Sequence, residues 1–583
     1  LIILTALLPI FAFQRVEGKM FSPLAFTLGF ALIGALISAL TIVPVLVSYL
    51  LSKNVVEKHT FMTRGLSWIF ERSLTWVDKN RKISYGIAAA SWLIAIFSAF
   101  SLGTEFLPHL NEGAIYIRAQ MPYSTSLQQS IDISEKLRTI MASYPEVKRV
   151  LSQTGRPNDG TDATGFFNIE LHAELLPKKE WKRHITKDEL ISEMRTNLEE
   201  YPGIVFNFSQ PIMDNVEEAV SGVKGSLAVK IFGYEPEQLE SYAAIVNNEL
   251  HKVPGVADLG IIHLKGQPEI QILLDQDKMA AYGVTTVDAS AVIEMAVGGK
   301  TVTEKFEGER KFDIRVRYLP EYRNSPTALG NLLVPTVNKN QVKLSSIADI
   351  KAVSGNAFLY RENNRRFIAV KFSVSGRDLG STIAEAQKRI SKVLPSLPKG
   401  MSIEWKGEFE NQVRATARLK QVIPISLGII FILLFTAFGN VRDAALIFLN
   451  VPFSLMGGIL ALHITGTNFS IAAGIGFICL FGIAVQAGVI LISFFKLNLQ
   501  EGMPLRQAVF YGTLRRVRPV FMTALMSICG LSPAALSTGI GSETQKPLAI
   551  VVIGGLFTDM ILALHVFPLI VEWVYSRSKN IAK

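Results

Sequence analysis

Long apolar runs constrain this chain more strongly than any other feature of its sequence. A helix needs about 20 mostly apolar residues to cross the hydrocarbon core of a bilayer. Charged residues make up 19% of the chain, whereas soluble domains usually carry about 25%. Apolar runs predict eight membrane segments, the first of them short: Leu1–Phe13, Leu24–Leu51, Ile83–Leu102, Val422–Phe438, Ala444–Ile464, Ile471–Phe495, Pro519–Leu536 and Leu548–Tyr575.

The first run, Leu1–Phe13, has no basic stretch before it. A secretory signal peptide would carry one, so we expect this run to be the end of a membrane helix that starts earlier. The chain has two cysteines, Cys479 and Cys529, both in apolar runs. This excludes a disulfide framework and a cysteine-based zinc module.

The net charge of +10 could indicate a nucleic-acid partner, but its distribution argues against one. Of the 59 basic and 49 acidic residues, residues 103–420 hold 40 of each, so the other 19 and 9 account for the whole excess. That excess lies in short loops beside apolar runs, where basic residues set membrane topology and meet anionic lipid. We therefore expect a lipid bilayer and no nucleic acid as a partner.

Basic loops also predict the orientation of the chain. The loop 52–82 carries seven Lys or Arg, and the loop 496–518 carries five. By the positive-inside rule these loops and the tail 576–583 are cytoplasmic. The long segment 103–420 then lies on the far side, in the periplasm of an inner-membrane protein. Within the first loop, Gly65–Val77 is predicted to be an amphipathic helix on the membrane surface.

The long segment repeats one local pattern four times. A polar helical stretch ends at a proline, and a run of β-branched and aromatic residues follows. The four prolines are Pro145, Pro202, Pro254 and Pro398. The repeat predicts an α+β domain built from βαβ modules of the split ferredoxin-like kind. The predicted organisation is membrane helices at 1–51, 83–102 and 421–575 around a folded domain at 103–420.

Motifs typical of enzymes are missing from the sequence. It contains no Walker A, GxSxG, HExxH or GxGxxG pattern, so neither catalysis nor ATP as an energy source is indicated.

An acidic helix start, PIMDNVEEAVSGVKG, is the first candidate site. Asp214 and Glu218 are four residues apart and share a face with Glu217 beside them, so their charges repel. A bound divalent cation would offset that repulsion. The alternative is a solvated helix N-terminus, where the helix dipole already favours acidic residues. His172, in an alternating strand, and Asp162, in a turn-rich segment with Asp159, could complete the site. Imidazole and carboxylate ligands suit zinc or cobalt, whereas sulfur ligands suit Cu(I).

Polar residues inside membrane segments are the second kind of candidate, because they are expensive there. Gln486 could bond between helices or join a proton path. Asp559 could titrate in proton coupling, or pair with a neighbouring helix. His565 follows six residues later, about 240° around a helix, so a direct relay between the two is not expected.

Five stretches closely resemble the heavy-metal efflux branch of the RND superfamily, the CusA/CzcA type, in the same order. They are RVEGKMFSPLAFTLGFALIGALISALTIVPVL, EFLPHLNEGAIYIRAQMP, QPIMDNVEEAVSGVKG, GQPEIQILLDQDKMAAYGV and LRRVRPVFMTAL. The resemblance implies an RND-type bundle with helices 5 to 12, and a periplasmic loop of porter and docking subdomains. It also implies a homotrimer, proton-driven antiport, a periplasmic membrane-fusion adaptor and an outer-membrane channel. No tightly bound cofactor is expected.

Some positions depart from the copper and silver members of that branch. An acidic residue in helix 10 and a lysine in helix 11 align with Gln486 and Val520, and two thioether ligands align near Asn168 and Glu218. The resemblance therefore favours Zn, Co, Cd or Ni as cargo over Cu or Ag. It also places the acidic proton-relay helix before Leu1. Two alternatives stay open: a multidrug-type exporter of hydrophobic compounds, and a secretion or lipid-handling protein on the same scaffold.

Overall fold

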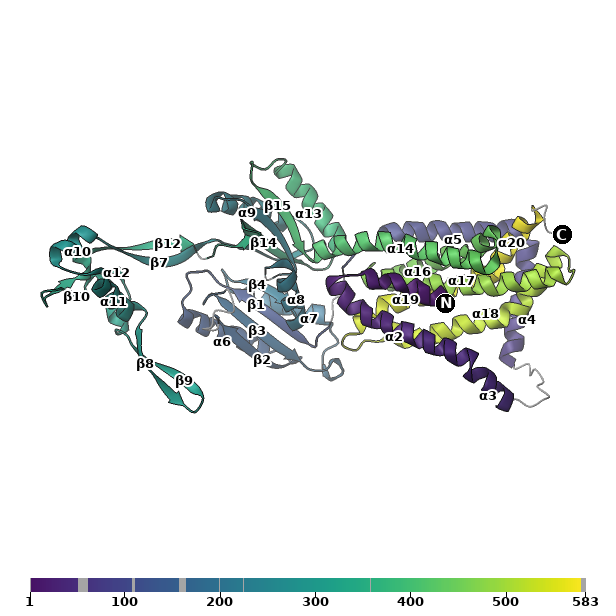
Figure 1. Ribbon diagram of the computed structural model, residues 1–583, viewed down its shortest axis with the longest axis horizontal. Coiled ribbons are helices and arrows are strands. Elements are labelled where there is room, and N and C mark those ends of the chain that lie inside the picture. The colour runs from purple at the N-terminus through teal and green to yellow at the C-terminus, as the bar shows by residue number, and fades with distance from the viewer. Residues whose placement is uncertain are drawn as a thin grey trace.

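The protein is elongated and has three parts in line (Figure 1). The computed structural model describes residues 2–50, 61–106, 111–156, 164–198, 200–223, 225–356 and 358–577. A bundle of long helices forms one end, two α/β layers form the middle, and a narrow arm extends from the other end. Both chain termini lie in the helical part.

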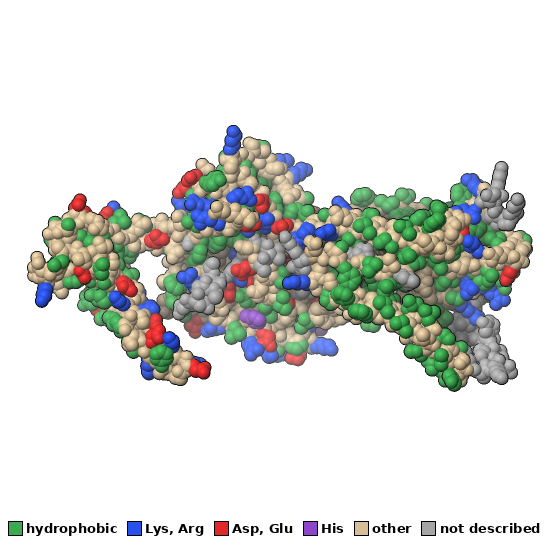
Figure 2. Space-filling view, in the orientation of Figure 1, with side chains coloured by type: hydrophobic (Ala, Val, Ile, Leu, Met, Phe, Trp, Pro, Cys, Tyr) green, Lys and Arg blue, Asp and Glu red, His purple; other side chains and the backbone are tan. Residues whose placement is uncertain are grey.

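Seven helical spans in the described part are long and apolar enough to cross a membrane, and Ile2–Ala12 is a shorter apolar helix. These eight correspond in order to the eight predicted segments. Figure 2 shows many hydrophobic side chains on the visible face of the bundle. The helices of this part are α1 (Ile2–Leu7), η1 (Leu8–Ala12), α2 (Arg15–Leu40), α3 (Ile42–Leu50), α4 (Phe61–Lys79), α5 (Arg81–Ser101), α14 (Glu408–Phe438), α15 (Val441–Phe448), α16 (Asn450–Thr465), α17 (Ile471–Gln500), α18 (Leu505–Leu536), η5 (Ser542–Thr544), α19 (Lys546–His565) and α20 (Phe567–Ser576).

Some helices begin or end at other residues than predicted, because hydropathy alone does not account for proline or for polar residues at helix ends. The predicted run Leu548–Tyr575 is two helices, α19 and α20, because Pro568 lacks the N–H that would continue the first. Conversely, α18 runs through Pro519 and begins 14 residues before it, at Leu505. The predicted amphipathic segment Gly65–Val77 lies inside α4.

Two sheets of the same topology form the middle of the molecule. The first is antiparallel with strand order β2-β3-β1-β4, and β14 pairs with both β6 and β5 in the second, giving β6-β14-β5-β15. The four predicted helix–proline–strand units are all present, as α6–β2, α7–β4, α9–β6 and α13–β15. Each sheet with its two helices is therefore a ferredoxin-like split βαβ unit. The elements are β1 (Ala114–Gln120), α6 (Leu127–Ala142), β2 (Val147–Thr154), β3 (Asn168–Leu175), η2 (Lys178–Glu180), α7 (Lys187–Leu198), β4 (Val205–Ser209), α8 (Pro211–Ser221), β5 (Leu227–Phe232), α9 (Pro236–His251), β6 (Val256–Ile262), β13 (Arg361–Glu362), β14 (Arg365–Val374), α13 (Leu379–Val393) and β15 (Ser402–Gly407).

The arm is an insertion between β6 and β14. Strands β7 (Lys265–Leu274) and β12 (Ala348–Asn356) pair into a long ribbon that leads to a small separate core around Met279, Val334 and Leu344 (Figure 1). The remaining elements of the arm are α10 (Gln276–Tyr282), α11 (Thr286–Val297), β8 (Lys300–Glu307), β9 (Arg310–Val316), η3 (Pro320–Tyr322), α12 (Pro326–Gly330), β10 (Leu333–Pro335), β11 (Gln341–Lys343) and η4 (Leu344–Ser346).

Candidate metal cleft and membrane carboxylate

One face of the first sheet is polar, and this face carries the first candidate site. Along β1, the side chains of Ile115 and Ile117 enter a core with α6 and α7, so Tyr116 and Arg118 point to the opposite face. Strand pairing sets Arg118 opposite Glu170 of β3, and Tyr116 opposite His172. Helix α8 packs against β1.

Helix α8 is fixed at both ends by its sequence. Pro211 occupies its first turn, and the Glu112 carboxylate accepts the free backbone N–H groups of Ile212 and Met213 at 2.6 and 2.9 Å. At the other end Gly222 takes the left-handed conformation, with φ of 66°. This capping positions the acidic side chains of the first two turns over the sheet.

Arg118 connects three carboxylates, and the cluster of Arg118, Glu170, Asp214 and Glu218 is called the cleft below. Its Nε donates to both Asp214 oxygens at 2.9 and 3.0 Å, and its Nη2 also bonds Asp214. The same Nη2 reaches Glu218 Oε2 at 3.3 Å, and Nη1 pairs with Glu170 Oε1 at 3.0 Å. The positive charge that the acidic helix requires is therefore supplied within the chain.

Burial separates the roles of these side chains. Arg118 is 5% exposed and Asp214 is 2% exposed, so Asp214 is not a solvated helix-start residue. Glu218 has a side chain that is 41% exposed and contacts Arg118 through one long bond. One guanidinium thus faces three carboxylates, and the excess negative charge is accessible at Glu218.

The protonation states of the donors suit this arrangement. Burial alone would lower the pKa of Arg118, but the hydrogen bonds and charge of Asp214, with the charge of Glu170, raise it. Burial and the hydrogen bond to Glu170 raise the pKa of the Tyr116 phenol. Tyr116 therefore stays protonated and donates to Glu170 Oε2 at 2.6 Å. Asn168 Nδ2 donates to the other Glu170 oxygen at 3.2 Å.

The structure brings together only part of the predicted metal-ligand set. His172 is half-buried beside Tyr116, with ring centroids 6.4 Å apart, on the same face as Arg118. Asp162 and the side chain of Glu217 lie outside the described residues. Within the described ranges, no three His, Cys, Asp or Glu side chains form a ready-made metal site. The ligand assignment therefore remains a prediction.

Arg118 and Glu170 belong to the cleft, although they are not among the predicted site residues. The alternating strand AIYIRAQ indicates where Arg118 lies, because an arginine between Ile117 and Ala119 must point away from the apolar face of its strand. The alternating strand NIELHAEL places Glu170 on a polar face in the same way.

In the bundle, the two predicted polar residues occupy different environments. Asp559 in α19 is 3% exposed, and its Oδ1 has no hydrogen-bond partner among the described residues. Gln486 in α17 is exposed. His565 contacts Ser73 of α4. An unpaired carboxylate among apolar helices is a candidate for proton transfer.

Known proteins resemble the chain over its whole length. Cobalt-zinc-cadmium resistance protein CzcA of Cupriavidus metallidurans is 37% identical, with 100% of this chain and 55% of that protein covered. Nickel-cobalt-cadmium resistance protein NccA of Alcaligenes xylosoxydans xylosoxydans is 35% identical with the same coverage. Cation efflux system protein CusA of Escherichia coli is 32% identical, covering 100% of this chain and 57% of that protein. The chain thus spans little more than half the length of these relatives.

Solved structures agree with the sequence comparison. The crystal structure of a heavy metal efflux pump matches with TM-scores of 0.89 and 0.90 in two crystal forms, at 36% and 35% identity, over 99% of this chain and 57% of that one. The AcrB/AcrD/AcrF family matches residues 1–574. These findings confirm the predicted α+β fold with an RND-type bundle. The chain belongs to the AcrB/AcrD/AcrF family of RND transporters and is similar to its heavy-metal efflux members.

Proposed function

We propose that this chain is part of a proton-driven RND pump that exports divalent heavy-metal cations. The observation that carries the proposal is the cleft in which three carboxylates face one guanidinium, with Glu218 accessible. A divalent cation at Glu218 would neutralise the remaining charge, and His172 lies on the same face of the sheet as Arg118. Relatives named for heavy-metal resistance support metal cargo over hydrophobic drugs.

The donor chemistry favours zinc, cobalt, cadmium or nickel over copper or silver. Carboxylate and imidazole ligands suit Zn(II) and similar ions, whereas Cu(I) prefers thiolate and thioether sulfur. The two relatives named for cobalt with zinc or nickel are 37% and 35% identical, and CusA is 32% identical. We propose that cargo comes from the periplasm or the cytoplasm.

The basic loops support an inner-membrane orientation in which both α/β layers and the arm face the periplasm. Here the layers would be the porter part and the arm the docking part. The pump would work as a homotrimer with a periplasmic adaptor and an outer-membrane channel, as its family likeness suggests. Asp559, with Gln486 on the adjacent helix α17, is proposed as part of the proton pathway.

A resistance assay tests this function. The whole pump is expressed in a host that lacks its own metal exporters, and growth is measured against Zn, Co, Cd, Ni, Cu and a hydrophobic drug. We expect protection against the first four metals, and Glu218→Gln should remove it. Glu193→Gln is a matched control, because Glu193 is 43% exposed and also pairs with one arginine, Arg183.

Zinc titration of the purified protein by calorimetry separates binding from transport. Glu218→Gln should weaken zinc binding about tenfold or more, the scale seen when groups supporting a metal site are lost, and Glu193→Gln should not. Unchanged titration curves would rule out a direct role for Glu218. Protection against the drug alone would favour a multidrug exporter, and no metal binding at all would favour a secretion or lipid-handling role.

A further inference from the structure

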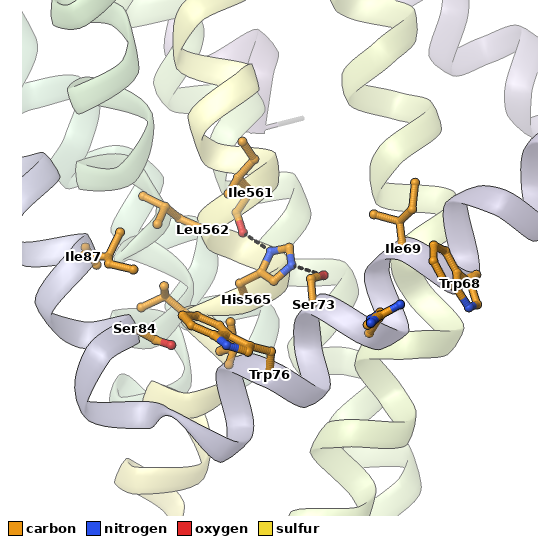
Figure 3. Close-up of a pocket in the computed structure, with 13 residues that line it drawn as sticks. Trp68, Ile69, Ser73, Trp76, Ser84, Ile87, Ile561, Leu562 and His565 are labelled. Atoms are coloured by element: carbon orange, nitrogen blue, oxygen red, sulfur yellow. Dashed lines mark hydrogen bonds between the residues drawn. The ribbon is translucent and has the colours of Figure 1, made fainter.

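A preformed groove lies between α4, the start of α5 and the end of α19 (Figure 3). Its volume is about 590 Å³, within the range of about 300–1,000 Å³ that is common for small-molecule sites. Its walls are mostly apolar and include Trp76, Ile87 and Leu562. The metal cleft lies elsewhere, on the polar face of the first sheet.

His565 lines the groove, and contacts at both ring nitrogens fix its imidazole. Its Nδ1 donates to the Ile561 carbonyl at 2.7 Å, and its Nε2 lies 2.8 Å from Ser73 Oγ (Figure 3). The imidazole also stacks on Phe70, with centroids 5.3 Å apart. Both ring nitrogens are therefore occupied, so the imidazole leaves no polar group for a ligand inside the groove.

Helix α4 buries some of its large side chains in the bundle and exposes others. On α4, the residues Phe70, Leu74 and Val77 are buried against the bundle. Trp68 and Trp76 on the same helix are 61% and 48% exposed. Tryptophans on an amphipathic helix are typical of the membrane–water interface, where one side meets acyl chains and the other meets headgroups.

The one charged side chain among the described residues that line the groove is basic. Arg72 lines the groove and lies over the Trp68 ring, 5.4 Å from the centroid. No Asp or Glu among the described residues lines the groove. On α4, Glu71 precedes Arg72 in the sequence but does not line the groove, and Asp78 bonds Arg81 and Arg506. On α20, Glu572 bonds Arg81. In the described part of the chain, Arg72 forms no ion pair.

We propose that this groove binds one anionic phospholipid. Its phosphate would pair with Arg72 at the rim, and an acyl chain would lie along Trp76, Ile87 and Leu562. Mostly apolar walls fit an acyl chain, and an arginine that forms no ion pair and lies beside tryptophan fits an anionic headgroup at the interface. The site would fasten α4 to α5 and α19 from the lipid side.

Native mass spectrometry of the purified protein tests the site, using phosphatidylglycerol and phosphatidylcholine with identical acyl chains. We expect phosphatidylglycerol to bind about fivefold more tightly, which is the preference that one arginine near the surface provides. Arg72→Gln should abolish this preference. Arg577→Gln is the matched control, since Arg577 also lies over a tryptophan, Trp573, but outside the groove.

A second variant tests the acyl part of the site. Ile87→Trp narrows the groove and should weaken both lipids several-fold without changing their ratio, in protein whose melting temperature confirms that it is folded. Equal affinity of the wild type for both lipids would overturn the proposal, as would an equal effect of Arg577→Gln. Displacement of phosphatidylglycerol by inorganic phosphate would also overturn it, because the ligand would then be a free anion.

Discussion

Replacing Arg118 with methionine should destabilise the polar face of the first sheet. Methionine keeps an unbranched apolar stem but removes the charge that Asp214 and Glu170 share. Both carboxylates are less than 10% exposed, and removing one partner of a buried ion pair costs about 3–5 kcal/mol. Glu218 adds little to that sum, because it is 41% exposed and exposed pairs contribute about 0–1 kcal/mol.

Hydrogen exchange of the β1 and β3 amides is the suitable assay, because it reports local opening without unfolding the membrane bundle. The opening free energy should fall by about 3–5 kcal/mol in Arg118→Met. Arg149→Met is the control, since Arg149 is 69% exposed in its pair with Glu174, and it should change protection by less than about 1 kcal/mol. Adding Asp214→Leu to Arg118→Met should restore part of the loss. A fall no larger than that of the control would refute the reasoning.

The same hydrogen-exchange experiment with zinc added tests the proposed cargo. Without Arg118, three carboxylates face one another, so a divalent cation should stabilise the variant more than the wild type. At a zinc concentration 100-fold above the dissociation constant, bound metal would return about 2.7 kcal/mol. If zinc does not change exchange in either protein, the carboxylate cleft is not a divalent-cation site.

Three further predictions concern other parts of the molecule. Gly457→Ala should destabilise the bundle by about 1–3 kcal/mol in detergent unfolding, because its Cβ would collide with Thr558 and the Gly554 carbonyl, whereas Gly428→Ala meets nothing within 4 Å and should be tolerated. Burial lowers the pKa of Lys187 to about 8 from 10.5. Between these pH values the unfolded chain holds a proton that the native protein has lost, so the free energy of unfolding, measured with urea, should rise as the pH rises through this window. Lys187→Met should remove that rise. Asp559→Asn should abolish proton-coupled metal transport in proteoliposomes while calorimetry still detects zinc binding.

Local sequence predicted the repeated units well. In each of the four units a proline stops a helix and a β-branched strand follows, and these local preferences agree with the final packing. Pro568 behaves in the same way when it divides α19 from α20. Pro519 does not, because neighbouring Val517 and Val520 are buried against the bundle and the helix continues through it. Tertiary packing decides between two such prolines, and a single sequence does not contain that information.

The cleft was only half predictable for a similar reason. The acidic residues of α8 are visible because their spacing is local. Their counter-ion Arg118 lies about 100 residues earlier, and only the pairing of β1 with β3 and β4 brings it to them. Without that partner, the sequence predicts either a bound metal or a solvated helix end. The structure adds a third component, the buried Arg118, and a bound metal would share the carboxylates with it.

The cleft and the membrane carboxylate are joined by continuous packing. Helix α8 contacts β15, and Gly407 ends that strand with φ of 90°, close against the Ser226 carbonyl, where a side chain would collide. Helix α14 starts at the next residue and enters the bundle, where it packs on α17, which in turn packs on α19 beside Asp559. Spatial continuity alone does not establish energetic coupling. Transport lost with zinc binding intact in Asp559→Asn would assign the carboxylate to the energy-coupling step, whereas loss of both would mean that Asp559 supports the packing through which the cleft is held.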